Sequence, residues 1–202
     1  MNSNGFFVIS LDFELHWGGI ELWDLNNKSS YFENTRKCIP QILELYAQYN
    51  IHCTWATVGL LFAKNKEQAL KFCPILKPSY LNNELNYYNY LFSKNVAGDE
   101  ESSPFHFAKS IIDVIVKEDN QELGSHTYGH YYCNEDGQNI HEFDNDLKAA
   151  QDLAKENFGV TLKSLVLPRN QLNLKYLKII EKNGFTSVRS NPEVWFWKKN
   201  DL

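Results

Sequence analysis

The chain has 202 residues, of which 43% are hydrophobic and 14% aromatic, and its formal net charge is -5. This composition suits one soluble globular domain, which we expect to span residues 1–202. The acidic balance lacks the basic footprint of sequence-independent nucleic-acid binding, so nucleic acid is not an expected partner. The apolar run at 6–11 is too short for a membrane span or a signal-peptide core, which makes the cytoplasm the expected location.

The first half of the chain alternates between short apolar runs and helical periodicity. Residues 6–13 (FFVISLDF) predict a buried strand, and apolar residues three or four apart predict a helix at 34–49. A second strand is expected at 51–58 and a second helix at 60–72. Residues 74–104 are rich in Asn, Tyr and Ser and interrupted by prolines, which predicts an irregular insertion.

The second half continues the same alternation. We expect, in chain order, a helix at 107–115, the strand segment ELGS at 122–125, a helix at 147–158, and then a strand, a helix and a last strand at 162–167, 173–182 and 185–189. This order predicts an α/β fold with a mainly parallel sheet covered by helices. Functional sites in such folds form at the carboxyl ends of the strands.

Two carboxylates, Asp12 and Glu14, stand where the first strand is expected to end. Residues two apart in a strand face the same side, so both side chains can point to one site. The pair suits a metal ligand beside a general base. A solvent-exposed strand end is the simpler explanation for an isolated pair of this kind.

Two histidines, His126 and His130, follow the ELGS segment in the run SHTYGH. Spaced four apart, they would lie on one face of a helical turn, close enough to bind one metal through neutral imidazoles. Alone they would also fit a pair of surface or hydrogen-bonded histidines. Together with the two carboxylates, they supply the oxygen and nitrogen ligands of an open catalytic divalent-metal site.

The order of three motifs resembles the polysaccharide deacetylase (NodB-homology) family. These are SLDFE at the first strand, SHTYGH later and the Pro-Arg turn at 168–169. The resemblance implies a distorted, incomplete (β/α) barrel, a divalent metal, and hydrolysis of acetamido groups on sugars. The flanking segments LDFELHWG and LPRNQ resemble the sequences of the branch that acts in bacterial surface-polysaccharide assembly more than those of the secreted enzymes.

Carried over to this chain, the resemblance implies that His126 and His130 bind the metal and that Asp12 is the catalytic base. The family has two adjacent aspartates, whereas here Phe13 follows Asp12, so Glu14 becomes the expected third ligand and the division of roles between the two carboxylates stays open. Arg169 resembles the arginine that braces the catalytic aspartate. Zinc is the expected ion, and iron, cobalt, manganese and nickel fit the same ligands.

The residue that would protonate the departing amine is not evident. The family uses a histidine in a late motif, but no histidine follows His141 here, so either another residue serves or the chain is a shortened form. His16 is one candidate, although packing beside Trp17 suits it equally. Tyrosines of the insertion could offer a platform for a sugar ring or could simply pack the loop: Tyr80, Tyr87, Tyr88 and Tyr90.

The expected function is therefore metal-dependent removal of an N-acetyl group from a sugar or a sugar-containing polysaccharide precursor. Two alternatives remain. Some relatives of this family hydrolyse cyclic amides or ureides with a modified site. A noncatalytic carbohydrate-binding or assembly protein would keep the fold without the complete chemistry, as the absent late histidine would allow. The oligomeric state is not indicated by the sequence.

Overall fold

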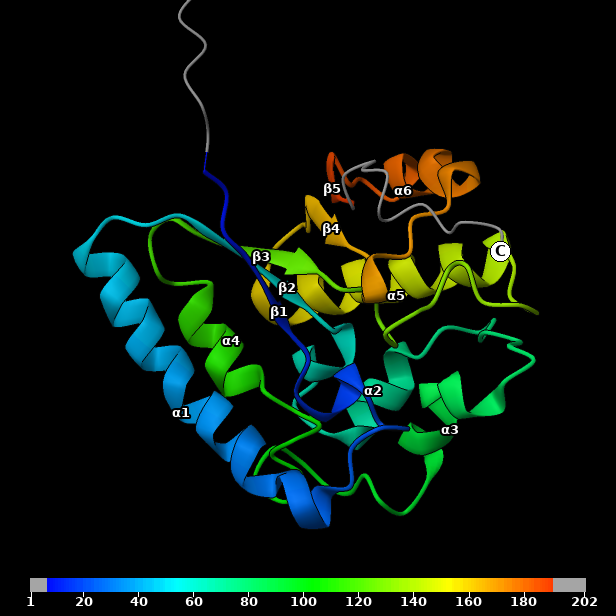
Figure 1. The fold of residues 1–202 in the computed structure, drawn as a ribbon, viewed down its shortest axis with the longest axis horizontal. Helices are drawn as coiled ribbons and strands as arrows, with labels where there is room; N and C mark the ends of the chain where they lie inside the picture. The colour runs from blue at the N-terminus through cyan, green and yellow to red at the C-terminus, as the bar shows by residue number, and fades with distance from the viewer. Residues whose placement is uncertain (1–6, 191–202) are drawn as a thin grey trace, which may run out of the picture.

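The protein is described by a computed structural model that covers residues 7–190. Its centre is one parallel sheet with the strand order β1-β2-β3-β4-β5, as Figure 1 shows. The strands are β1 (Ser10–Phe13), β2 (Cys53–Thr57), β3 (Gln121–Ser125), β4 (Ser164–Val166) and β5 (Ser187–Arg189). Each strand pairs with the strand that precedes it in the chain, so every connection is a crossover that returns to the same end of the sheet.

The sheet is curled, because its two edge strands approach each other. The guanidinium of Arg189 on β5 donates to Ser10 Oγ at 3.0 Å and to Asp12 Oδ2 at 2.6 Å, and both acceptors lie on β1. Strands at opposite edges of a flat five-stranded sheet would be too far apart for these contacts. The predicted α/β fold with an incomplete (β/α) barrel is confirmed.

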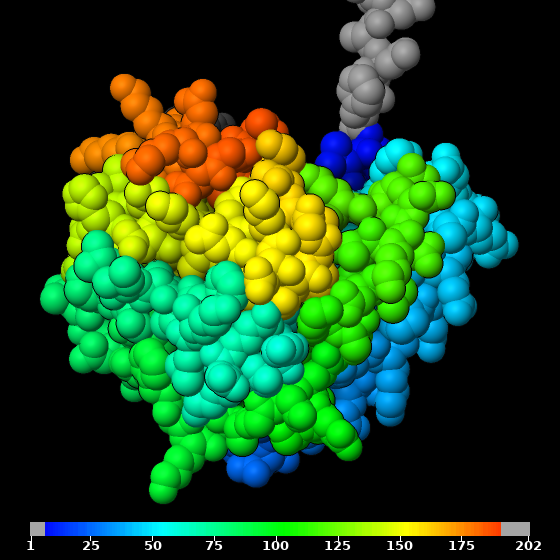
Figure 2. Space-filling model, turned by 180° about the vertical axis from the view of Figure 1, so that it is seen from behind, coloured from blue at the N-terminus to red at the C-terminus, as the bar shows by residue number. Residues whose placement is uncertain are grey.

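Helices form the outer layer in two groups. α1 (Leu25–Gln48) packs on α4 (Lys109–Ile115), which also contacts β3. α5 (Ile140–Phe158) contacts α2 (Lys66–Phe72) and α6 (Leu177–Lys182), and Figure 2 shows α2 beside α5 on the back of the molecule. Residues 7–190 contain no helix with the length and apolar character needed to cross a membrane.

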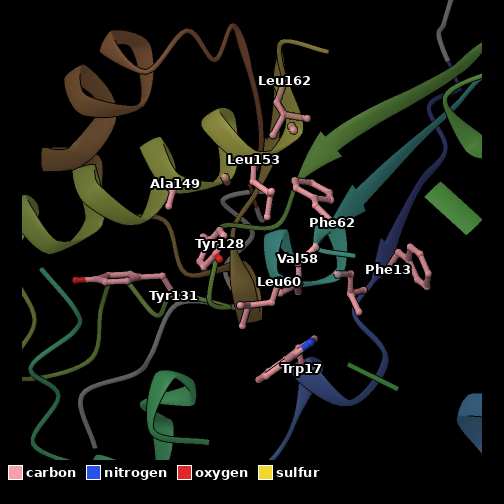
Figure 3. Packing of buried hydrophobic residues seen from close by; sticks show 14 of the residues in the cluster. Phe13, Trp17, Val58, Leu60, Phe62, Tyr128, Tyr131, Ala149, Leu153 and Leu162 are labelled. Atoms are coloured by element: carbon pink, nitrogen blue, oxygen red, sulfur yellow. The ribbon is translucent and has the colours of Figure 1, made fainter. Parts of the chain in front are cut away.

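The apolar core reaches directly beneath the loops that follow the strands. Figure 3 shows Leu153 of α5 facing Phe62 and Leu162, and all three are fully buried. Trp17, after β1, and Tyr128, after β3, are also fully buried. Each of these two residues lies within three positions of a predicted site residue, so the core fixes the backbone that carries the site.

Four predicted helices differ from the observed ones. α5 begins at Ile140 instead of residue 147, after the capping residue Asn139, and the helix expected at 173–182 is divided into a 3-10 turn, Leu174–Tyr176, and α6. α1 begins at Leu25 instead of residue 34, because Asp24 caps it by accepting a hydrogen bond from the backbone N–H of Asn26 at 3.0 Å. Residues 26–30 of this helix are polar and mostly exposed, so little apolar periodicity marks its start. The helix expected at 60–72 is divided into a 3-10 turn, Gly59–Phe62, and α2, which Asn65 caps.

Residues 74–104, predicted as an irregular insertion, contain a 3-10 turn, Asn83–Leu85, and the short helix α3 (Tyr87–Phe92). The insertion is attached firmly to α5. Ser79 donates through its hydroxyl to Glu142 at 2.7 Å, and Tyr88 donates to Asp146 at 2.5 Å. The insertion therefore packs on the body of the protein beside the loop that follows β3.

Candidate metal centre

His126 and His130 lie on a loop and not on a helical turn, which corrects the geometry predicted for them. His126 directly follows β3, and its backbone N–H donates to the carbonyl of Thr57 on β2 at 2.9 Å. Thr127 and His130 have positive φ values of 63° and 57°, which no α-helix contains. The loop folds back on itself and brings the two imidazoles together, with ring centroids 5.1 Å apart.

Glu14 meets both histidines. Its Oε1 lies 2.8 Å from His126 Nε2 and 3.2 Å from His130 Nε2. The three residues form a group in which one ligand atom from each lies within 4.8 Å of the others. Both histidines are buried, whereas the Glu14 side chain is 23% exposed, so solvent or a substrate has access from the carboxylate side.

The tautomer of His126 shows that this arrangement fits a cation. Its Nδ1 lies 2.9 Å from the backbone carbonyl of Val166, and a carbonyl can only accept, so Nδ1 carries the proton. Nε2 is then the ring nitrogen that faces the Glu14 carboxylate, and it would bind a cation through its lone pair. Two acceptors at 2.8 Å are stabilised by a cation between them. A carbonyl that holds the second nitrogen of a ligand histidine is also the usual support of a metal site.

Glu14 remains ionised at neutral pH. Burial by itself raises the pKa of this carboxyl, but the contacts with His126 and His130 outweigh it and hold the pKa well below its ordinary value. His130 has a lowered pKa, because burial disfavours its charged form. An ionised carboxylate and a neutral imidazole are the forms in which glutamate and histidine bind a divalent metal.

Asp12, two residues before Glu14 in the chain, has a different partner from the predicted one. β1 ends at Phe13, so strand parity no longer governs Glu14, and the two carboxylates have separate contacts. Asp12 pairs with Arg189 at 2.6 Å. Arg169, predicted to brace Asp12, instead pairs with Glu21 at 2.5 Å. The predicted contact between Arg169 and Asp12 is therefore corrected, because Arg189 makes that contact instead.

The family is shown by a profile comparison. The profile described as polysaccharide deacetylase matches residues 29–188, which is most of the chain. The chain belongs to the polysaccharide deacetylase family. A search of curated proteins found no match.

Solved structures show the same fold. A CE4-family pseudoenzyme from Bacillus anthracis is 13% identical, with a TM-score of 0.51 over 90% of this chain and 41% of its own. A mutant of this pseudoenzyme, described as having restored enzymatic activity, is 14% identical, with a TM-score of 0.52 over 90% of this chain and 43% of its own. A putative polysaccharide deacetylase from Mycobacterium smegmatis is 13% identical, with a TM-score of 0.51 over 88% of this chain and 48% of its own. The chain therefore spans less than half the length of each of these three proteins.

His16, considered above as a proton donor, is enclosed in the core of this family member. It is 2% exposed, and its Nδ1 lies 3.0 Å from His106 Nε2 while its Nε2 lies 2.9 Å from the carbonyl of Trp23. Burial lowers its pKa. With both nitrogens engaged inside the protein, the structure favours a packing role for His16.

The tyrosines of the insertion do not form an exposed platform. Tyr80, Tyr87 and Tyr88 are each at most 4% exposed, and only Tyr90 is half-buried. Their hydroxyl groups bond to protein atoms near the histidine loop: Tyr80 accepts from the backbone N–H of Tyr132, and Tyr88 donates to Asp146. Of the two interpretations considered for these residues, loop packing is the one that matches the structure.

Sequence reasoning missed three charged residues near the site. Arg189 and Glu21 carried no motif, and their partners became visible only in the fold. Asp146 did carry a signal, because it lies among the buried positions Phe143, Leu147 and Ala150 of α5, where an acidic residue requires partners. Burial raises its pKa to about 6, although its hydrogen-bond donors lower it.

Proposed function

We propose that this chain is a metal-dependent hydrolase that removes an N-acetyl group from a sugar in bacterial surface-polysaccharide metabolism. The proposal is supported most directly by the Glu14 carboxylate facing Nε2 of His126 at 2.8 Å and of His130 at 3.2 Å. Family membership supports a carbohydrate deacetylase. The residues that flank the motifs support the surface-polysaccharide branch.

The ligand set leaves coordination positions open for water and substrate. Three protein ligands of two histidines and a carboxylate are typical of catalytic zinc, and the same set accepts iron, cobalt, manganese or nickel. A divalent ion held by Glu14, His126 and His130 would polarise the acetamide carbonyl and lower the pKa of a bound water.

Asp12 is the proposed general base. Its carboxylate is about one-third exposed, with a side-chain exposure of 34%, so it can receive a proton from water. The hydrogen bond from Arg189 holds it in one orientation, and the same guanidinium is anchored on Ser10. This gives Arg189 the positioning role that the sequence assigned to Arg169.

Metal content and acetate release test the proposal together. Purified protein, supplemented with Zn²⁺ or Co²⁺, is assayed on N-acetylated sugars by acetate release and by elemental analysis. The double variant His126→Ala, His130→Ala should lose stoichiometric metal, while Asp12→Asn should keep the metal and lose about 100- to 10,000-fold in rate. His52→Ala, an exposed histidine, is the matched control. Tight metal retained by the double-histidine variant would refute the site.

A noncatalytic carbohydrate-binding protein is the second candidate, favoured by one observation. His16, the histidine considered for protonating the departing amine, is enclosed in the core, so the described residues do not assign that proton donor. Metal binding without acetate release in the same assay would support this second candidate over the hydrolase.

A further inference from the structure

The two histidines of the candidate metal centre are held in different ways. His126 has its Nδ1 fixed by the carbonyl of Val166. Nδ1 of His130 is buried, and no atom of residues 7–190 forms a hydrogen bond with it. Metal-bound histidines almost always donate this second N–H to a fixed acceptor, which sets the orientation of the ring. The orientation of His130 must therefore come from another source.

Two tyrosine rings enclose the imidazole of His130. Tyr87 lies parallel to it, with ring centroids 5.5 Å apart and an interplanar angle of 4°. Tyr132 lies perpendicular, at 5.1 Å and 84°. These are the offset-stacked and edge-to-face arrangements that aromatic rings prefer. Since Tyr87 is 1% exposed and Tyr132 is fully buried, neither ring is free to move away.

The two tyrosines are fixed in turn by a charged pair. The Tyr87 hydroxyl donates to Glu21 Oε2 at 2.5 Å and accepts from the Tyr132 hydroxyl at 2.9 Å. Arg169 pairs with the other oxygen of Glu21 at 2.5 Å, and its guanidinium carbon lies 4.4 Å from the centre of the Tyr132 ring. Every polar atom of the two tyrosine side chains is thus engaged.

We propose that Tyr87 is a positioning residue for His130, whose ring it orients by stacking in place of the missing hydrogen-bond acceptor. Glu21 and Arg169 hold Tyr87 and Tyr132 in the orientation that this contact needs. The inference rests on the proposed metal site. It gives the insertion at 74–104 a function, because Tyr87 begins α3.

Co²⁺ alone is the probe for the test. Its affinity is measured for each full-length variant by titration and its visible absorption spectrum is recorded, at a temperature where circular dichroism shows the variant to be folded. Tyr87→Leu should weaken Co²⁺ binding by about 10- to 100-fold and change the spectrum, because His130 loses its stacked partner. Tyr87→Phe keeps the ring and should keep most of the affinity.

Tyr90→Leu is the matched control. Tyr90 lies on the same helix and packs against the rings of His16, Trp17 and His106, and no ring contact joins it to His130 among the described residues. It should lower thermal stability without changing the affinity or the spectrum. Co²⁺ binding by Tyr87→Leu equal to that of Tyr90→Leu would overturn the inference while the metal site stands.

Failure of the metal site itself has a different signature. If the wild type and the double variant His126→Ala, His130→Ala bind Co²⁺ equally, both the site and the positioning role fall. Should Tyr87→Leu not fold, the paired variant Glu21→Leu, Arg169→Leu removes the anchor of Tyr87 with the net charge unchanged. It should weaken Co²⁺ binding about tenfold, and wild-type affinity would overturn the inference.

Discussion

At the scale of single residues, the three proposed ligands come from two distant parts of the chain, Glu14 after β1 and the two histidines after β3. Glu14, His126 and His130 were predicted from residue type and spacing, and the structure brings them together. The partners of Asp12 and Arg169 could not be predicted, because they depend on how far the sheet curls. Arg189 reaches Asp12 only because β5 approaches β1, a distance that no local pattern encodes.

Gly18 leaves the space that the Glu14 carboxylate occupies, because it has no Cβ. A Cβ at this position would lie 2.1 Å from Oε2 of Glu14, so the carboxylate would have to move. Gly18→Ala should therefore weaken metal binding about tenfold or more, since the ligand leaves its place facing the histidines. Gly19→Ala is the control, because its nearest atoms would be at 3.4 Å. Isothermal titration with Zn²⁺ compares them, and equal affinities would contradict the prediction.

At the scale of elements, α5 supports the loop between the two histidines. Asp146 on α5 accepts from the backbone N–H of Tyr128 at 2.6 Å and of Gly129 at 3.1 Å, and from the hydroxyl of Tyr88 on α3. One buried carboxylate therefore joins a helix, the insertion and the histidine loop. The sequence predicted α5 from its apolar periodicity, but the partners of Asp146 lie in the histidine loop and in the insertion, whose paths no periodicity describes.

Asp146→Ala should cost about 3 kcal/mol or more in unfolding free energy, because three donors would stay buried without an acceptor. It should also weaken metal binding, as the loop between the ligands loses its anchor. Asp144→Ala, on the same helix, removes the ion pair with the 64% exposed Lys182 and should cost less than about 1 kcal/mol. Urea unfolding followed by circular dichroism measures both, and similar losses would contradict the argument.

At the scale of the whole molecule, alternation of strands and helices predicted an α/β fold with a mainly parallel sheet, and the family resemblance implied the incomplete barrel. Alternation alone does not predict how buried side chains from different elements pack together. His16 and His106 form such a point, with Nδ1 of His16 3.0 Å from Nε2 of His106 and both residues 2% exposed. Burial lowers the pKa of His16, and burial together with His16 lowers that of His106 to about 3.

This pair should make the fold sensitive to acid. The unfolded chain binds protons at these histidines near pH 6.5, whereas the folded protein does so only at lower pH. Their contribution to stability is therefore present above pH 6.5 and lost as the pH falls toward 3, by up to about 1.4 kcal/mol per pH unit for each proton. His106→Phe should show a shallower loss between pH 6.5 and 4 in thermal unfolding. Parallel curves would exclude the pair as the cause.

The sequential order of the strands has a consequence for synthesis. Each strand pairs with the one made before it, so a nascent chain leaving the ribosome can extend the sheet without waiting for a later partner. All three proposed ligands lie in the part of the chain that ends with the loop after β3. The three proposed ligands are therefore made before β4 and β5, but His126 gains its support only when Val166 of β4 is in place, and the contact of Arg189 with Asp12 needs β5.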